Sequence, residues 1–396
     1  MELSDYSGNS DRKVVKGIPM RVFHIVTHFD VGGAERVAIN IAKSKNPEIE
    51  YHIVEIIRSR TPFSHVFVRE LQDAGIQYHR AHLPEIKFHY LFERIASLVF
   101  PLWFIFVFRK YRPNVIHCHT EIPELATFCF FKLFPKLLKQ CKVVRTIHNT
   151  KLWNGMEWFG PKVERFLQKQ HANVAISIAV SDKYQSLYGE KPPIIYNGMN
   201  IPKCERKYER LRDGYTNILF AGRFEEQKGI VHLIRIIQCL NNDDRYFFHV
   251  IGDGQLKEQL IKGLVDCHYV EIQPALYGLD EYLSSFDYVI MPSEHEGLGL
   301  LAVEASFSYT PVIINNCSGL NETLPSDWPL KVENNDINSY MNIFQNVLPM
   351  LNRKQLGEYA FQFAKQHFAI EKMQAGYEML YEETISFKLM GKKIFN

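Results

Sequence analysis

The sequence predicts an α/β protein that consists of two doubly wound parallel sheets. From about residue 20, short apolar runs typical of strands alternate with helix-like runs. This alternation stops in a polar segment at residues 197–215 and then begins again. Alternating strands and helices are typical of βαβ units, which form parallel sheets covered by helices on both faces. At 396 residues and 46% hydrophobic content, the chain is long enough for two such cores.

The first series of strand-like runs occupies residues 21–196. Its first run, Arg21–Thr27, leads into a turn with Gly32 and Gly33 and then into a helix-like run at residues 34–45. We expect all the runs of this series to pair in one sheet. The other predicted strands are Tyr51–Ile57, Val115–His119, Lys142–Ile147, Val174–Val180 and Pro193–Tyr196.

The second series predicts a second sheet of the same kind. Its predicted strands are Asn217–Ala221, Tyr246–Ile251, Tyr269–Gln273, Asp287–Met291 and Pro311–Asn315. We therefore expect four segments, namely a disordered arm (1–18), a first domain (19–198), a second domain (199–371) and a C-terminal helix that packs back on the first domain (372–396). Ligands of doubly wound sheets bind beyond the carboxyl ends of the strands, so we expect a cleft between the domains.

Charge and cysteine content restrict the class of protein. The net charge of +2 conceals an asymmetry, because residues 1–200 hold 27 Lys/Arg against 18 Asp/Glu and the remainder holds 19 against 26. A basic first half suggests an anionic surface or acceptor. The seven cysteines are scattered and form no Cys-x-x-Cys pair, which favours a reducing compartment over a disulfide or zinc framework. The longest apolar run, Leu98–Phe108, has eleven residues and is by itself too short to span a bilayer.

The most informative motif lies at residues 293–305, between a strand-like run and a helix-like run. Gly297 and Gly299 allow backbone N–H groups to approach phosphate oxygens at a helix N-terminus. Glu296 and Glu304 would repel a diphosphate unless each accepts hydrogen bonds from hydroxyl groups. The pattern therefore indicates a sugar nucleotide, and the alternative is a surface helix with two solvated glutamates.

Two cations follow the first strand of the second series. Arg223 and Lys228 lie five positions apart in the loop that leaves this strand, where they could neutralise a departing diphosphate. The chain has no Asp-x-Asp pair, which disfavours a diphosphate held by a metal ion. Taken alone, the two residues could equally be solvated surface cations.

Together, these motifs resemble those of the family-4 retaining glycosyltransferases of the GT-B fold, over about residues 20–375. The matching stretches are Gly222-Arg223…Lys228-Gly229, Glu296-x7-Glu304, Ile195-Tyr196-Asn197-Gly198 and Gly32-Gly33-Ala34-Glu35-Arg36. The resemblance implies a fold of two Rossmann-like domains that face each other across a cleft.

The resemblance also implies a role for each matching residue. Arg223 and Lys228, beside Gly222, would hold the donor diphosphate. Glu296 would contact the transferred sugar, and Glu304 would bind the ribose hydroxyls. The other residues implied near the donor are Gly33, Gly297, Leu298, Gly299 and, as a catalytic residue beside the sugar, His148.

Histidines at two strand ends are further candidates. His148 follows a predicted strand, where cleft residues gather, although a lone loop histidine is often a structural hydrogen-bonding group. His117 and His119 have the i, i+2 spacing of a metal pair, but no partner motif accompanies them, so we predict no metal site. His119 is either an acceptor-side residue or a structural histidine.

The chain also departs from the family pattern. Tyr309 stands where the family usually has glycine, two residues before Pro311, and can alter the turn there. The usual glycine after the third strand is replaced near Gln273 and Pro274, in the loop expected to meet the nucleobase. The base therefore stays open, with a UDP-sugar favoured.

We accordingly predict a retaining glycosyltransferase that needs no metal or other cofactor. It would move a sugar from a nucleotide-sugar donor to a hydroxyl of a glycan or lipid-linked oligosaccharide in surface polysaccharide synthesis. The alternatives are a GT-B epimerase or phosphorylase, an inactive membrane-docked binding protein, and a nicotinamide dehydrogenase. The last is disfavoured because Lys257 occupies the third glycine position after Gly252 and Gly254. No motif supports nucleic-acid binding.

Two apolar segments flanked by cations suggest a membrane surface as a further partner. They are Phe92–Phe108, followed by Arg109, Lys110 and Arg112, and Phe128–Lys142. This pattern predicts a cytoplasmic protein that is peripheral on the inner face of the plasma membrane. Ordinary amphipathic helices that cover a sheet would give the same pattern.

Overall fold

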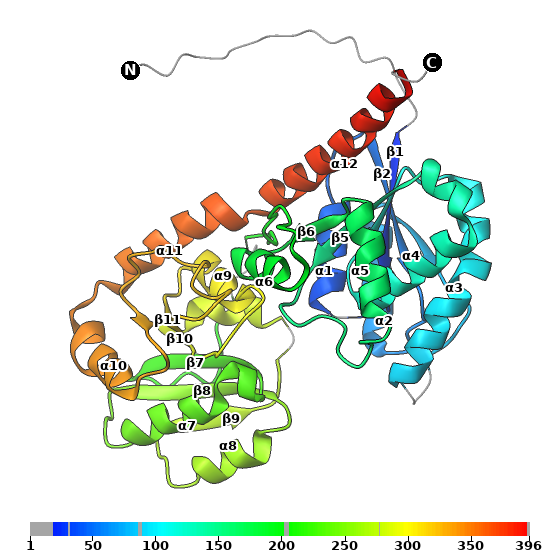
Figure 1. Ribbon diagram of the computed structural model, residues 1–396. Helices are drawn as coiled ribbons and strands as arrows, with labels where there is room; N and C mark the ends of the chain where they lie inside the picture. Colours follow the sequence, from blue (N-terminus) through cyan, green and yellow to red (C-terminus); the bar gives the residue numbers. More distant parts are fainter. Residues whose placement is uncertain (1–18, 31, 86–88, 202–205, 277, 394–396) are drawn as a thin grey trace, which may run out of the picture.

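The computed structural model describes residues 19–30, 32–85, 89–201, 206–276 and 278–393, and these form two parallel six-stranded sheets (Figure 1). The strand order is β3-β2-β1-β4-β5-β6 in the first sheet and β12-β11-β10-β7-β8-β9 in the second. In each sheet the chain starts near the centre and winds outward in both directions. The predicted fold of two doubly wound Rossmann-like domains is therefore confirmed, while the predicted arm at residues 1–18 lies outside the described residues.

The strands of the first domain are β1 (Met20–Val26), β2 (Ile49–Glu55), β3 (Gln77–Arg80), β4 (Val115–Cys118), β5 (Lys142–Ile147) and β6 (Asn173–Ala175). Its helices are α1 (Gly33–Ala42), α2 (Pro62–Asp73), α3 (His89–Tyr111), α4 (Glu121–Leu133), α5 (Gly160–Lys169) and α6 (Ile178–Tyr188), and a 3-10 turn, η1, covers Pro135–Lys139.

The strands of the second domain are β7 (Thr216–Arg223), β8 (Tyr246–Asp253), β9 (Val270–Gln273), β10 (Tyr288–Met291), β11 (Val312–Asn315) and β12 (Lys331–Val332). Its helices are α7 (Ile230–Cys239), α8 (Lys257–Gly263), α9 (Leu300–Phe307), α10 (Ile337–Asn342) and α11 (Arg353–Phe368), and α12 (Ile370–Lys393) follows them. The shorter helical turns are η2 (Glu226–Lys228), η3 (Leu279–Ser285), η4 (Ile343–Val347) and η5 (Leu348–Met350).

The structure corrects the predicted strands at two places. The strand predicted at Val174–Val180 ends at Ala175, because the Ser177 hydroxyl accepts a hydrogen bond from the Val180 N–H and starts α6. The run Pro193–Tyr196 makes only an isolated bridge between Ala175 and Ile194. Strands β3 and β12 were missed; both are short strands at sheet edges and lack a long apolar run.

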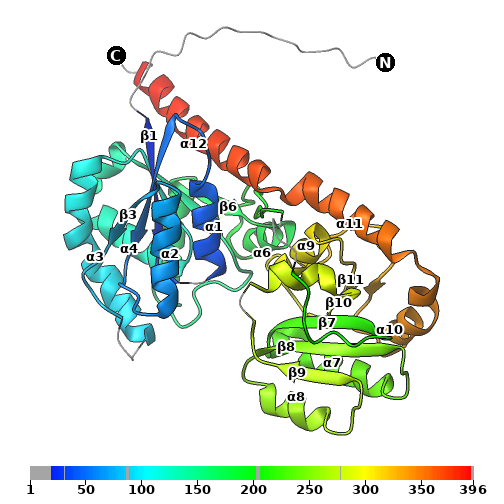
Figure 2. The ribbon, with the colours of Figure 1, turned by 180° about the vertical axis from the view of Figure 1, so that it is seen from behind.

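Helix α12 runs from the second domain back along the first (Figures 1 and 2). Tyr377 and Tyr381 are fully buried in the core that β1, β2 and α1 also form. The chain crosses between the domains at two adjacent points, where Met199 and Ala369 form a bridge. Gly198 is necessary there, since a Cβ atom would lie only 2.8 Å from the Ala369 carbonyl oxygen.

A buried charge cluster supports β5. Arg145 is fully buried, and its Nη1 donates to Glu164 Oε2 at 2.8 Å. Its Nε lies 2.8 Å from Glu124 Oε1 as a charge contact. Burial raises the pKa of Glu124 to about 8, although the Arg145 charge opposes this shift. The cluster anchors the strand that leads to His148.

Helix α3 is longer than its central apolar run suggested. The eleven residues Leu98–Phe108 lie inside a 23-residue helix that includes Pro101. Within the described part of the chain, α3 is the one helix that is long and apolar enough to cross a membrane by these two measures alone. Its inner face, with Ala96, Phe100 and Phe104, belongs to the core of the first domain.

Candidate active site

The two main sequence motifs meet at the centre of the second sheet. Arg223 ends β7 and Lys228 lies in η2, while the loop with Glu296 follows β10. Strands β7 and β10 are neighbours, and the strand order reverses between them. In doubly wound sheets, ligands bind in the crevice beyond the strand ends at such a switch point. The sequence-based placement of these motifs in a common site therefore agrees with the topology.

Lys228 and Glu296 form an ion pair. Lys228 Nζ lies 2.8 Å from Glu296 Oε1 and 3.0 Å from Oε2. The Glu296 carboxylate is buried, with 6% of its side chain exposed, whereas the Lys228 side chain is 22% exposed. A backbone hydrogen bond of 2.9 Å from Glu294 to Gln227 holds the two loops together. A bound diphosphate would therefore share or replace this pairing.

Arg223 occupies a more open position. Its side chain is 67% exposed and pairs with Glu225 at 3.0 Å. Exposed ion pairs contribute little to stability, so the guanidinium can exchange this partner for a phosphate at small cost.

Backbone geometry fixes the position of Lys228. Gly229, the next residue, has a φ of +69°, and a Cβ atom there would lie 1.9 Å from the Pro292 carbonyl oxygen. Only glycine fits this contact. The turn with Lys228 is thus held directly against the end of β10.

Glu304 lies on α9 and is half-buried. Burial, with a smaller contribution from Asp280, raises its pKa to about 7. No described residue donates a hydrogen bond to its carboxylate. A half-buried carboxylate without a donor is suited to accept hydrogen bonds from the hydroxyls of a ligand.

His148 follows β5 and faces this loop from the first domain. Its Nε2 is buried without a hydrogen-bond partner among the described residues. Burial, and then the charge of Arg145, lowers the pKa of His148 to about 4, so the ring is neutral at pH 7. A Cβ atom on Gly297 would lie 2.6 Å from the His148 carbonyl oxygen, so the two loops touch.

The sequence did not identify two residues that join the domains here. The Ser177 hydroxyl donates to the Gly297 carbonyl oxygen at 2.6 Å. Glu322 accepts hydrogen bonds from the Ile178 and Ala179 N–H groups, at 2.7 and 3.1 Å, at the N-terminus of α6. The one local signal for Glu322 is its position in the loop that follows the predicted strand Pro311–Asn315, since such loops border the ligand-binding edge of the sheet.

Three other residues of the sequence motifs, Leu298, Gly299 and Gly222, differ in their surroundings. Leu298 is 6% exposed and packs with Ile176 and Val180 of the first domain, so its side chain belongs to the domain contact. Gly299 packs on Leu320. Gly222, the residue before the end of β7, lies beside the aliphatic part of Lys228. Because the Leu298 side chain is buried, only its backbone is a candidate contact to a nucleotide-sugar donor.

Gly33 and a polar cavity lie at the switch point of the first sheet. Gly33 is the exposed first residue of α1, and a Cβ atom there would meet nothing within 4 Å. The cavity, of about 340 Å³, opens beyond the ends of β1 and β4. Its lining includes Thr27, His28, Glu35, Glu93, Arg94, Thr120 and Glu121. Burial raises the pKa of Glu35 to about 7, opposed by its own backbone N–H.

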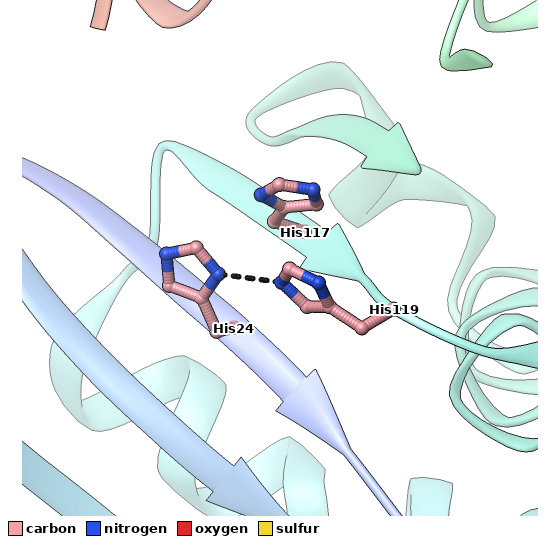
Figure 3. A group of neighbouring side chains, drawn as sticks. All are labelled: His24, His117 and His119. Carbon is pink, nitrogen blue, oxygen red and sulfur yellow. Dashed lines mark hydrogen bonds between the residues drawn. The ribbon is translucent and has the colours of Figure 1, made fainter. Parts of the chain in front are cut away.

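His119 belongs to a buried group of histidines that the sequence revealed only in part (Figure 3). His24, on β1, lies 2.8 Å from His119 through their Nδ1 and Nε2 atoms. One ring nitrogen of each of His24, His117 and His119 lies within 4.8 Å of the others. Both ring nitrogens of His117 are already 2.7 Å from hydroxyl groups, those of Tyr381 and Thr146. The structure therefore favours the structural alternative for His119, which is 1% exposed.

Tyr309 adopts the backbone conformation of the glycine that it replaces. Its φ is +58°, in the left-handed region, which is uncommon for a bulky residue. The ring stacks on Phe361 of α11, with centroids 4.3 Å apart. This packing offsets part of the cost of the backbone conformation.

Family models match both domains of the chain. The model for glycosyltransferase family 4 matches residues 31–202, and the model for glycosyl transferases group 1 matches residues 215–348. An uncharacterized protein of the cps region of Klebsiella pneumoniae is 29% identical over 68% of this chain and 78% of its own length. The capsular polysaccharide biosynthesis glycosyltransferase CapH of Staphylococcus aureus is 23% identical over 81% of this chain and 84% of its own. Two other relatives are matched over only 59% and 55% of their length.

A solved structure shows the same fold. The Anabaena protein Alr3699/HepE, in complex with UDP and glucose, superposes with a TM-score of 0.71 at 16% identity, over 92% of this chain and all of that one. With both halves matched by family models, and with two facing Rossmann-like domains, this chain belongs to the family-4, group 1 glycosyltransferases of the GT-B fold.

Proposed function

We propose that the enzyme transfers a sugar from a nucleotide-sugar donor, with a UDP-sugar favoured, to a hydroxyl of a glycan or lipid-linked oligosaccharide in surface polysaccharide synthesis. The observation that carries the proposal is the pairing of Lys228 with Glu296 at the switch point of the second sheet. A cation for phosphate and a carboxylate for sugar hydroxyls lie side by side there. The similarity to CapH, a glycosyltransferase of capsular polysaccharide biosynthesis, supports the acceptor class, and the UDP and glucose bound to HepE support the donor class.

The diphosphate leaves as an anion, and its charge must be stabilised. Lys228 and Arg223 supply two cations, and the loop before α9 adds backbone N–H groups. We propose that these groups suffice without a metal ion. Glu304 would hold the ribose through its unpartnered carboxylate, which fixes the nucleotide relative to the cations.

Retention of configuration would follow from attack on the face that the diphosphate leaves. The bond between the anomeric carbon and the phosphate oxygen breaks, and the bond to the acceptor oxygen forms on the same face. The acceptor proton passes to the departing phosphate oxygen. Glu296, held by Lys228, would contact the sugar as positive charge develops on its ring. His148, which is neutral, would offer its unpartnered Nε2 to a sugar hydroxyl.

The experiment is a thermal-shift panel of nucleotides and sugar nucleotides, followed by product analysis. A donor at about 100 times its Kd should add roughly 2.7 kcal/mol of stability. NMR of the product made with the selected donor should show the anomeric configuration of that donor. An inverted product would contradict retention, and an epimerised nucleotide sugar or a sugar phosphate would identify an epimerase or a phosphorylase.

We propose the cytoplasm as the compartment. All six described cysteines are free, which suits a reducing environment. Sugar nucleotides in the same compartment would reach the cleft directly.

A further inference from the structure

Helix α3 turns an apolar face to the solvent. Its exposed apolar residues recur at the spacing of one helical face over about four turns. They are Leu91 (63% exposed), Ile95 (48%), Leu98 (52%), Val99 (40%), Leu102 (60%) and Phe106 (70%), and we call this set the apolar stripe. Helices that cover a sheet normally turn polar residues outward. The stripe therefore has no explanation in the packing of the described residues.

The opposite face of α3 is required by the fold. Phe100, Phe104 and Phe108 are at most 3% exposed and pack in the core of the first domain. The Ser97 hydroxyl also donates to the Ile122 carbonyl oxygen at 3.3 Å. If α3 crossed a membrane, these residues would have to leave the sheet. Whatever covers the stripe must therefore lie on the surface of the folded domain.

The surroundings of the stripe are cationic. Arg109, Lys110 and Arg112 are exposed at the end of α3. The neighbouring α4 and η1 add the exposed Lys132, Lys136 and Lys139, and α3 and α4 lie side by side in both ribbon views. Neither residues 95–120 nor residues 125–156 contain an acidic residue. An anionic surface complements this charge.

An apolar cavity of about 380 Å³ adjoins the stripe. Val99, Leu102, Trp103 and Phe106 line it from α3, and the segment with Leu83 lines it from the sheet side. Such a cavity can admit an acyl chain, and tryptophan is enriched at membrane–water interfaces. Together with the cations at the end of α3 and on α4 and η1, it favours lipid over a folded protein as the occupant.

We propose that the apolar stripe docks the first domain on an anionic lipid leaflet, with α3 parallel to the membrane surface. A consequence, which rests on the proposed function, concerns the acceptor. Glu93 and Arg94 of α3 also line the polar cavity beside Gly33. Docking would bring this cavity close to the leaflet, where the sugar of a lipid-linked acceptor can enter it.

The test is flotation of the full chain with vesicles of phosphatidylglycerol and phosphatidylcholine, compared with phosphatidylcholine alone. The variant L102E/F106E places two charges in the stripe. The matched control, V265E/M350E, changes two residues of the second domain that are 74% and 88% exposed. We expect the wild type and the control to bind anionic vesicles, and the stripe variant to bind at least about tenfold more weakly. Added salt should weaken wild-type binding, since it shortens the Debye length.

Two controls separate this proposal from others. All four substitutions are at exposed side chains, so the melting temperatures should match the wild type. Equal vesicle binding by the stripe and control variants, or no binding by the wild type, would overturn the proposal. Stripe-dependent dimers in sedimentation without vesicle binding would replace the lipid by a second copy of the chain.

Separate activity assays test the proposed function. Transfer to a soluble acceptor, or slow hydrolysis of the sugar nucleotide by water, does not require a membrane. If these reactions persist in a protein that ignores vesicles, only the docking proposal fails. If the protein binds vesicles and consumes no sugar nucleotide, the proposed function fails and the docking surface stands.

Discussion

Replacing Glu304 with glutamine should change nucleotide affinity and stability in opposite directions. Burial raises the pKa of Glu304 to about 7 from an ordinary value of 4.5. In the proposed ribose contact, the ionised carboxylate is the stronger acceptor, because both of its oxygens can accept hydrogen bonds from the two hydroxyls. Its ionised fraction rises from about one-tenth at pH 6 to about nine-tenths at pH 8, so wild-type affinity should rise about tenfold over this interval. The E304Q variant should bind more weakly at pH 8 and show no such rise.

The same raised pKa makes the wild type less stable at high pH. Because the folded protein holds the Glu304 proton more tightly than the unfolded chain, this contribution to stability is present below pH 4.5 and is lost as pH rises through 7. One pKa unit corresponds to about 1.4 kcal/mol, so the loss is at most about 3.5 kcal/mol. E304Q lacks this titration and should be the more stable protein above pH 7, with little difference below pH 4.5.

Two assays measure these effects. Isothermal titration with a UDP-sugar at pH 6, 7 and 8 gives affinity, and the diphosphate diester itself does not titrate in this interval. Urea unfolding at pH 4.5 and 8 gives stability. E209Q, at an exposed glutamate, is the matched control and should behave as the wild type. Wild-type affinity that is equal at pH 6 and 8, or an E304Q variant that is destabilised at pH 8, would refute the reasoning.

Four further changes test the rest of the site and its support. K228A should cut turnover about 100-fold and destabilise the protein by about 1–3 kcal/mol, since it leaves the buried Glu296 carboxylate unpaired; adding E296Q should restore stability without restoring turnover. R223A should lower turnover to a similar degree but leave the melting temperature unchanged, because this side chain is mostly exposed. Turnover should persist in excess EDTA if Arg223 and Lys228 neutralise the charge of the diphosphate. R145M should destabilise the fold by about 3–5 kcal/mol, because it leaves the buried Glu164 carboxylate without its cation.

Each of these expectations has a contrary outcome. Wild-type turnover in both K228A and R223A would show that the diphosphate lies elsewhere. Activity lost on chelation and regained with Mg²⁺ would end the metal-free proposal. Urea unfolding of R145M at the wild-type midpoint would mean that the buried pair of Arg145 and Glu164 does not support the fold.

Local sequence predicted most of the strands well, for a physical reason. A strand buried on both faces needs a continuous apolar run, and β5 has the predicted bounds Lys142–Ile147. The loops that follow such strands begin at the carboxyl edge of the sheet, where ligands bind. The placement of Arg223, Lys228 and Glu296 beyond the ends of two neighbouring strands follows from this geometry. The weakest predictions fell on short edge strands, where apolar runs are too brief to be distinctive.

Contacts between distant segments could not be predicted in this way. His24 meets His119 because β1 and β4 are neighbours, although 95 positions separate them in the chain. Glu322 meets the N-terminus of α6 because the two domains approach each other there, where Ser177 also contacts Gly297. No local pattern encodes either neighbour. The exposed apolar side chains of α3 are a further case. Both faces of this helix are apolar, so packing alone decides which face is buried in the domain.

By itself, the sequence determined the two doubly wound domains, the family motifs and the residue types at the donor site. These depend on local propensity and on the position of each loop after its strand. Only the tertiary structure decided that Lys228 pairs with Glu296, that Ser177 and Glu322 join the domains, and that the apolar stripe of α3 faces outward. The physical reason is that hydrogen bonds, ion pairs and burial depend on distances between atoms, which the packing of the whole chain sets.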